Sequence, residues 1–135
     1  MTGTLVGDEQ LHAAAIITRL NAILPASVRA YDSDDVPDVK PAAYVEVLVS
    51  RRFGAAPARG TASTTRAGWR VAARVVDQTS VPNARRTANF VRTALEFYRL
   101  SVGGKTSTPV QFETAEAIGP DDGWWSGLTA YTYAI

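Results

Sequence analysis

The sequence predicts an α+β fold in which a mainly antiparallel β-sheet packs against two α-helices, in the order α-β-β-β-α-β-β. Two segments place apolar residues at steps of three and four, which is typical of amphipathic helices. Several others alternate apolar and polar residues, which indicates half-buried strands. The 135 residues, 46% of them hydrophobic, suffice for a single domain over 1–135 and exclude a two-domain enzyme.

The first predicted helix begins at Asp8, whose carboxylate suits the N-cap position, and it ends before Pro25. His12, the only histidine, is expected on the surface of this helix. The apolar stripe expected to face the core consists of Ala13, Ile16, Ile17, Leu20, Ile23 and Leu24.

A short strand over 27–31 is followed by a polar connection over 32–41, where two prolines and four aspartates predict a water-facing loop. Alternation then predicts strands over 42–53 and 69–79, which form a long hairpin. The residues between them, 54–68, are mostly small or polar, so we expect a mobile loop there.

Ser80 suits the N-cap of a second helix, because Pro82 then falls in the first turn, where a missing amide costs nothing. We expect this helix to continue to about Leu100. Its core stripe consists of Ala84, Ala88, Val91, Leu95 and Tyr98, widened by Phe90, Ala94 and Phe97. A second hairpin follows, with strands over 108–118 and 126–135 and a turn over 119–123.

Charge is nearly balanced over the whole chain but uneven along it. The 14 Lys and Arg and 13 Asp and Glu give a net charge of +1, which argues against a protein that mainly neutralises nucleic-acid phosphates. Residues 1–50 carry 3 basic and 7 acidic side chains, 51–99 carry 10 and 2, and 100–135 carry 1 and 4. Acidic and Arg-rich parts of neighbouring copies could therefore meet; a solvated surface with chance clustering is the alternative.

Few residues offer catalytic or ligand chemistry. The absence of cysteine excludes disulfides, thiolate metal sites and cysteine nucleophiles. His12 beside Asp8 could act as a base in a small enzyme, but a lone histidine without a nucleophile motif favours a surface position. The aspartates of 32–38 lack the central glycine and final glutamate of a calcium loop, although a weak magnesium or calcium contact between subunits is left open. We therefore expect no enzyme activity, catalytic residue, cofactor or metal site.

The longest apolar stretch, Ala13 to Ile17, is too short to span a membrane, and the amino terminus lacks the pattern of a signal peptide. We expect a soluble, intracellular protein without a membrane partner.

The candidate interface residues are mostly arginines near the hairpin loop and on the second helix, together with acidic and aromatic residues. They are Arg51, Arg52, Phe53, Arg59, Arg66, Arg70, Arg85, Arg86, Asp34, Asp35 and Trp124. Trp124 and Trp125 are adjacent, so one is expected in the core and the other exposed. The arginines could bind RNA or DNA, but the loop has almost no aromatic residues for base stacking, and an acidic protein surface needs fewer assumptions.

Five short patterns occur in order along the chain. They are Val28-Arg29-Ala30-Tyr31-Asp32, Val36-Pro37, Pro41-Ala42-Ala43-Tyr44-Val45-Glu46-Val47, Gly68-Trp69-Arg70-Val71 and Asp121-Asp122-Gly123-Trp124-Trp125. These patterns, and the order of helices and strands around them, resemble the tail terminator (tail completion) proteins of long-tailed bacteriophages. The resemblance spans nearly the whole chain.

The resemblance implies a structural protein without catalysis that assembles as a ring, usually of six copies, on the end of a completed tail tube. Such a ring stops tube polymerisation and offers the surface to which the DNA-filled head attaches. Its implied partners are further copies of itself, the major tail tube protein and the head-tail connector or head completion protein, with DNA only passing through the lumen.

The same resemblance implies a place in the tail or neck of the virion, with assembly in the host cytoplasm. The loop over 54–68 would project from the ring and contact the tube or the connector. Another phage neck or head-tail connector protein is the alternative within this class, and an Arg-rich nucleic-acid-binding module is the alternative outside it.

Overall fold

The computed structural model describes residues 4–52 and 67–135, with side chains from residue 9 onward in the first segment. A six-stranded sheet forms its centre. Five of the strands follow the order β1 (Arg29–Asp32), β2 (Ala43–Arg51), β3 (Gly68–Asp77), β8 (Trp124–Ala134) and β6 (Gln111–Ala115), and the short β7 (Gly119–Asp121) also pairs with β8. β1 is parallel to β2, and the other pairs are antiparallel.

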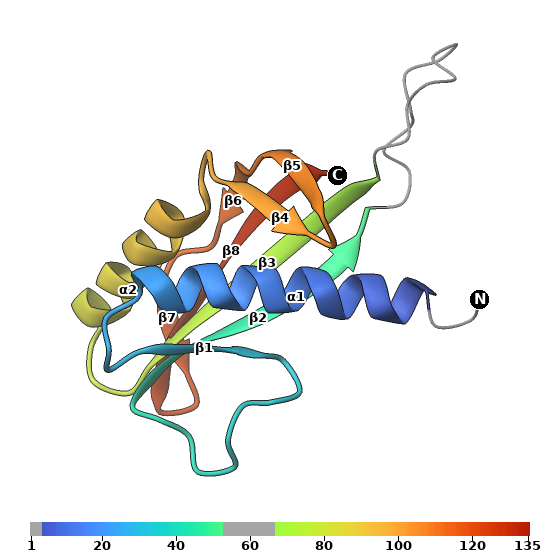
Figure 1. Ribbon diagram of the computed structural model, residues 1–135. Coiled ribbons are helices and arrows are strands. Elements are labelled where there is room, and N and C mark those ends of the chain that lie inside the picture. Colours follow the sequence, from blue (N-terminus) through green and yellow to red (C-terminus); the bar gives the residue numbers. More distant parts are fainter. Residues whose placement is uncertain (1–3, 53–66) are drawn as a thin grey trace.

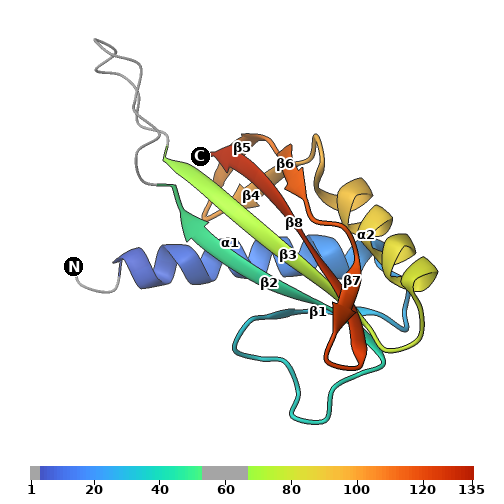
Figure 2. The same ribbon diagram turned by 180° about the vertical axis from the view of Figure 1, so that it is seen from behind.

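Two helices, α1 (Thr4–Ile23) and α2 (Val81–Leu95), lie on the same face of the sheet (Figure 1). A separate hairpin of β4 (Arg99–Val102) and β5 (Lys105–Pro109) lies beside α1 on that face. Seen from behind, the strands lie in front of both helices, so no described element covers the second face (Figure 2). This arrangement confirms the predicted α+β class with its two helices and largely antiparallel sheet.

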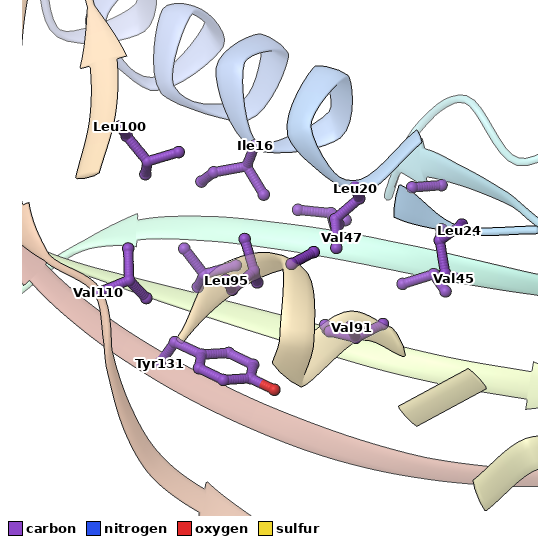
Figure 3. Close-up of a cluster of buried hydrophobic side chains, with 14 of the residues drawn as sticks. Ile16, Leu20, Leu24, Val45, Val47, Val91, Leu95, Leu100, Val110 and Tyr131 are labelled. Atoms are coloured by element: carbon purple, nitrogen blue, oxygen red, sulfur yellow. The ribbon is translucent and has the colours of Figure 1, made fainter. Parts of the chain in front are cut away.

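The hydrophobic core lies between the helices and the covered face of the sheet (Figure 3). Alternate residues of β2 and β3 point into it because successive strand side chains face opposite sides. Its largest fully buried apolar side chains are Tyr131, Ile16, Leu20, Leu95, Leu100, Val45, Val47, Val71, Val75, Val91 and Val110. The predicted stripe of α1 therefore does face the core, with Ile17 and Ile23 at its border.

The first helix differs from the prediction at its start. It begins at Thr4, so Asp8 lies within the helix and is not its N-cap. His12 was expected at the surface but is only 4% exposed. Helical spacing places it one position before Ala13 and one turn before Ile16, at the side of the stripe that meets Trp69 of β3.

The second helix begins as predicted, with the Ser80 side chain accepting a hydrogen bond from the Asn83 amide at 3.2 Å. It ends at Leu95, five residues before the predicted Leu100. Apolar residues alternate after the helix, so residues 99–102 form β4 instead. Gly103 and Gly104 both have positive φ and form the turn into β5.

The remaining predicted strands are placed correctly but divided differently. The predicted strand over 108–118 is split between β5 and β6, and residues 119–121 of the predicted turn form β7. The turn itself is confined to Asp122 and Gly123, both with positive φ. The predicted loop over 54–68 lies outside the described residues except at its end, where Gly68 is the first residue of β3.

The outer edge of β1 is closed by α1. The Asn21 side chain accepts a hydrogen bond from the Ala30 amide at 2.8 Å, and its amide group donates to the Ala30 carbonyl at 3.5 Å. Both main-chain groups of Ala30 that face away from β2 are thereby occupied.

Candidate assembly surfaces

The second face of the sheet, which we term the open face, carries ion pairs between its strands. Arg74 of β3 contacts Glu46 of β2 at 3.5 Å and also pairs with Asp121 of β7. Arg70 of β3 donates to Glu113 of β6 at 2.8 Å. Both arginines are thus engaged by carboxylates of their own chain.

Aromatic rings cluster at one end of the open face. Tyr44 of β2 packs edge to face against Tyr31 of β1, with ring centroids 6.4 Å apart, and against Trp124 of β8, at 6.3 Å. Burial raises the pKa of the Tyr44 hydroxyl above its ordinary value, and Arg74 opposes this shift. Trp124 is half-buried here, while Trp125 packs against the core, so the two tryptophans occupy opposite faces as predicted.

An acidic surface lies beside the N-terminal half of α1. A pocket of about 290 Å³ is lined by Glu9, Gln10, Ala13, Asp32, Ser33, Asp34, Leu48 and Val49. Its charged lining residues are all carboxylates, and its apolar side chains include Ala13 and Val49. Leu48 also borders the pocket, but it pairs with Ala72, so its side chain points to the open face. The predicted interface residues Asp34 and Asp35 are both exposed in the turn after β1, and Asp34 lines this pocket.

A basic surface lies on the outer side of α2. Arg85, Arg86 and Arg92 are exposed there. Arg92 donates to Glu96 at 2.8 Å, and this hydrogen bond lowers the pKa of the Glu96 carboxyl. Arg99 follows the helix, donates to the Ser107 carbonyl at 3.3 Å, and is also exposed. Four exposed arginines and one glutamate therefore follow the length of α2 and the residues just after it.

The end of α2 carries an unusual residue. Phe97 has φ +69°, a left-handed conformation in which glycine is the usual residue after a helix, and its side chain is 74% exposed. Its amide donates to the Val110 carbonyl at 2.7 Å, which fixes this conformation. A hollow beside it is lined by Asn89, Arg92, Thr93, Glu96 and Phe97.

The other predicted interface residues are scattered. Arg51 ends β2 with its guanidinium 5.9 Å from the ring centre of Trp69, and Arg52 is exposed. Phe53, Arg59 and Arg66 lie outside the described residues. The structure therefore brings Arg85 and Arg86 together on α2 and places Arg51, Arg70 and Trp124 elsewhere on the sheet.

Sequence reasoning missed Phe97, Glu9 and Asp32 as surface features. Phe97 and Tyr98 were predicted for the core face of the second helix, but they are 74% and 38% exposed, because the helix ends at Leu95 and not at Leu100. Apolar residues at Tyr98, Leu100 and Val102 recur every second position, and this signal for a strand could have ended the helix earlier.

His12 occupies an aromatic site in the interior. Its ring stacks on Trp69 with centroids 3.8 Å apart, and its Nδ1 atom shares a hydrogen bond with the Tyr133 hydroxyl. Burial raises the pKa of Tyr133, so this hydroxyl keeps its proton and can donate it to the ring nitrogen. These contacts give His12 a structural role in joining α1 to β3 and β8.

Within residues 4–52 and 67–135, no group of three or more His, Asp or Glu residues lies close enough together to hold a metal ion. Among the helices described, none is both long and apolar enough to cross a membrane.

No protein-family model matches the chain, and no curated protein matches its sequence. Solved structures do match its fold. A chain from the virion of a native gene transfer agent particle has a TM-score of 0.68 and 16% sequence identity, covering 97% of this chain and 96% of that one. The gp17 protein of bacteriophage SPP1 has a TM-score of 0.58 and 19% identity, covering 96% of this chain and 91% of that one. The chain has a fold found in bacteriophage-type particles.

Proposed function

We propose that this chain is a tail terminator, a structural protein that forms a ring, with six copies, on the end of a phage tail tube. The ring stops tube polymerisation and presents the surface to which the head attaches. The main support is the match in fold, over nearly the full length of both chains, with a protein of a gene transfer agent virion and a bacteriophage protein. The sequence patterns that resemble those of tail terminators support the end of the tail tube as its place in the particle.

The charged surfaces suit such an assembly. The basic surface on α2 and the acidic pocket beside the N-terminal half of α1 lie at different places on one chain, and they carry opposite charge. A contact between two different surfaces is heterologous, and it produces a closed ring when the rotation between copies closes. The assembled ring would lie in the virion tail or neck, with the tail tube protein and the head-tail connector as partners, after assembly in the host cytoplasm.

The role is structural and not enzymatic. His12, the residue on which an enzyme hypothesis depended, is stacked against Trp69 and bonded to Tyr133 in the interior. The nucleic-acid hypothesis loses support because Arg70, Arg74 and Arg92 are paired with carboxylates of the same chain.

Negative-stain imaging and sedimentation over a concentration series, with isolated tail tubes added, test this proposal. We expect uniform rings and their binding at tube ends. Rings that bind a connector but ignore tube ends would indicate another neck protein, and a chain that stays monomeric with and without tubes would contradict the proposal. Salt-sensitive binding to duplex DNA or RNA without rings would favour the nucleic-acid module.

A matched variant tests the contribution of 54–66 to attachment. This segment would be replaced by Asn-Gly, a two-residue hairpin turn, so that Gly68 and β3 are kept. We expect an unchanged fold and loss of attachment to the tube or connector. Normal infectious particles assembled from this variant would contradict a role of the segment.

A further inference from the structure

The exposed Phe97 does not serve the stability of the folded monomer. A bulky residue in the left-handed region costs backbone energy that glycine avoids, and the 74% exposed ring contributes little to the core. Strained backbone of this kind is concentrated at functional sites. The aromatic ring of Phe97 also lies beside Arg92 and a hollow on α2. Aromatic side chains and arginines are enriched in protein interfaces.

The acidic pocket offers a complement to this feature on the same chain. It has apolar lining residues in Ala13 and Val49 and a carboxylate rim of Glu9, Asp32 and Asp34. Phe97 shares its hollow with Arg92 and Glu96, and the exposed Arg99 follows two residues later, so basic side chains outnumber acidic ones around it. The two surfaces therefore match both in an apolar centre and in the sign of the surrounding charge.

The two surfaces cannot meet within one molecule. α2 packs at the C-terminal part of α1, where Arg19 donates to the Ala94 carbonyl at 2.8 Å, whereas the pocket begins at Glu9 and Gln10. Gln10 and Arg19 are nine residues apart, or about 14 Å along a helix. Both views of the molecule show α2 at one end and the N-terminal part of α1 at the other (Figures 1 and 2). A contact between them must join two copies.

We propose that Phe97 inserts into the acidic pocket between α1, β1 and β2 of the neighbouring copy, with Arg92 and Arg99 beside it facing Glu9, Asp32 and Asp34. This inference rests on the proposed ring assembly and names the contact that builds it. Because the donor and acceptor surfaces differ, each copy uses both, and the contact repeats head to tail around the ring.

The sharpest test is the substitution Phe97→Gly, followed by sedimentation and thermal unfolding. Removal of a central aromatic anchor should weaken self-association at least tenfold. The same change should raise the melting temperature of the monomer by about 2–4 °C, because glycine relieves the left-handed strain. A variant that folds poorly would show both weaker self-association and a lower melting temperature. Weaker self-association together with a higher melting temperature therefore identifies Phe97 as a contact residue.

Three controls accompany this variant. Phe97→Ala removes the phenyl group without adding the backbone flexibility of glycine, and we expect it also to weaken self-association. Val39→Ala shortens another exposed apolar side chain, 88% exposed, and should leave association unchanged. Asp34→Lys, in the pocket, should weaken association more than Asp35→Lys beside it, although both make the same change in charge.

The natural absence of cysteine allows a direct test of the geometry. Thr93→Cys places a thiol in the hollow beside Phe97, and Gln10→Cys places one at the pocket. Under mild oxidation, a mixture of the two single variants should give covalent dimers, and the double variant a ladder of larger species. Either single variant alone should remain mostly uncrosslinked.

The outcomes separate this inference from the proposed function. If the wild-type protein and Phe97→Gly both form normal rings, and the cysteine variants give no crosslinks, the proposed contact is wrong. The ring proposal itself would still hold. Loss of tube binding with unchanged rings would assign Phe97 to the tube and also overturn the contact. A wild-type chain that never assembles would contradict both.

Discussion

The two faces of the central sheet bury their side chains in different ways. On the covered face, helices lie over apolar residues such as Val47 and Val75, which are fully buried. On the open face, Ala72, Val76 and Ala130 are also buried although no described element lies over them. There the shielding comes from long neighbouring side chains, including the paired Arg70 and Arg74 of β3. Arginines in strands can thus cover a sheet instead of binding an external anion.

The largest expected difference between the faces concerns the helix layer. Leu20→Ala should lower the free energy of unfolding by about 2–5 kcal/mol, because Leu20 is fully buried on the side of α1 that faces the core. Leu11→Ala on the same helix should change it by less than about 0.5 kcal/mol, since Leu11 is 51% exposed. Urea denaturation measures both, and equal effects would show that α1 does not stabilise the covered face.

A glycine of β8 tests how tightly this strand is packed. A Cβ atom at Gly127 would lie 2.7 Å from Ile118 Cδ1 and 3.2 Å from the Glu116 carbonyl oxygen. Gly127→Ala should therefore destabilise the fold by about 1–3 kcal/mol. Gly119→Ala is the control, because a Cβ atom there meets nothing within 4 Å among the described residues. Thermal unfolding that did not distinguish the two variants would refute close packing of this segment.

Alkaline pH compares buried tyrosines on the two faces. Burial raises the pKa of Tyr133 on the covered face and of Tyr44 on the open face. Their stabilising effect is complete below about pH 10, the ordinary tyrosine value, and is lost as pH rises toward the raised values. We expect tyrosinate absorbance from these two residues to appear at a higher pH than that from exposed tyrosines, and to appear together with unfolding.

The variant Tyr133→Phe sharpens this comparison, because burial raises the pKa of Tyr133 more than that of Tyr44. We expect the decline in stability above pH 10 to become shallower in this variant than in Tyr44→Phe. A steeper decline would have the wrong sign for a group whose folded-state pKa is raised.

The smallest effect is expected from the ion pairs of the open face. Arg74 and Asp121 are both 37% exposed, so a double-mutant cycle of Arg74→Ala and Asp121→Ala should give a coupling below about 1 kcal/mol. The coupling should shrink further in 1 M salt because of screening. A large coupling that is insensitive to salt would show that this pair is shielded from solvent by something other than its own chain.

The sequence predicted the covered face well because its signals are local. The stripe of α1 and the alternation of β2 and β3 both follow from burial against one core, and the Ser80 cap needs only its own first turn. The end of α2 was wrong because helix periodicity continued past Leu95, while the decisive contact, between the Phe97 amide and the Val110 carbonyl, joins residues thirteen positions apart.

The candidate surfaces were predicted only in part, because their partners are distant in sequence. Asp34, Arg85 and Arg86 are exposed as expected. The pairing of Arg70 with Glu113 depends on the strand order β3-β8-β6, in which β6 is brought alongside from more than forty residues away. Likewise the pocket joins residues from α1, β1 and β2, so neither its apolar lining nor its carboxylate rim forms a contiguous motif.

The Asn21 side chain has a consequence for how copies can join. A free strand edge is a template for adding another strand, and repeated addition leads to fibrils. At Ala30 the edge of β1 is already occupied by Asn21, so an incoming strand would have to displace two hydrogen bonds. Amyloid-like growth at this edge is thereby disfavoured, and any association of copies there would depend on side-chain contacts, whose geometry can limit the number of copies.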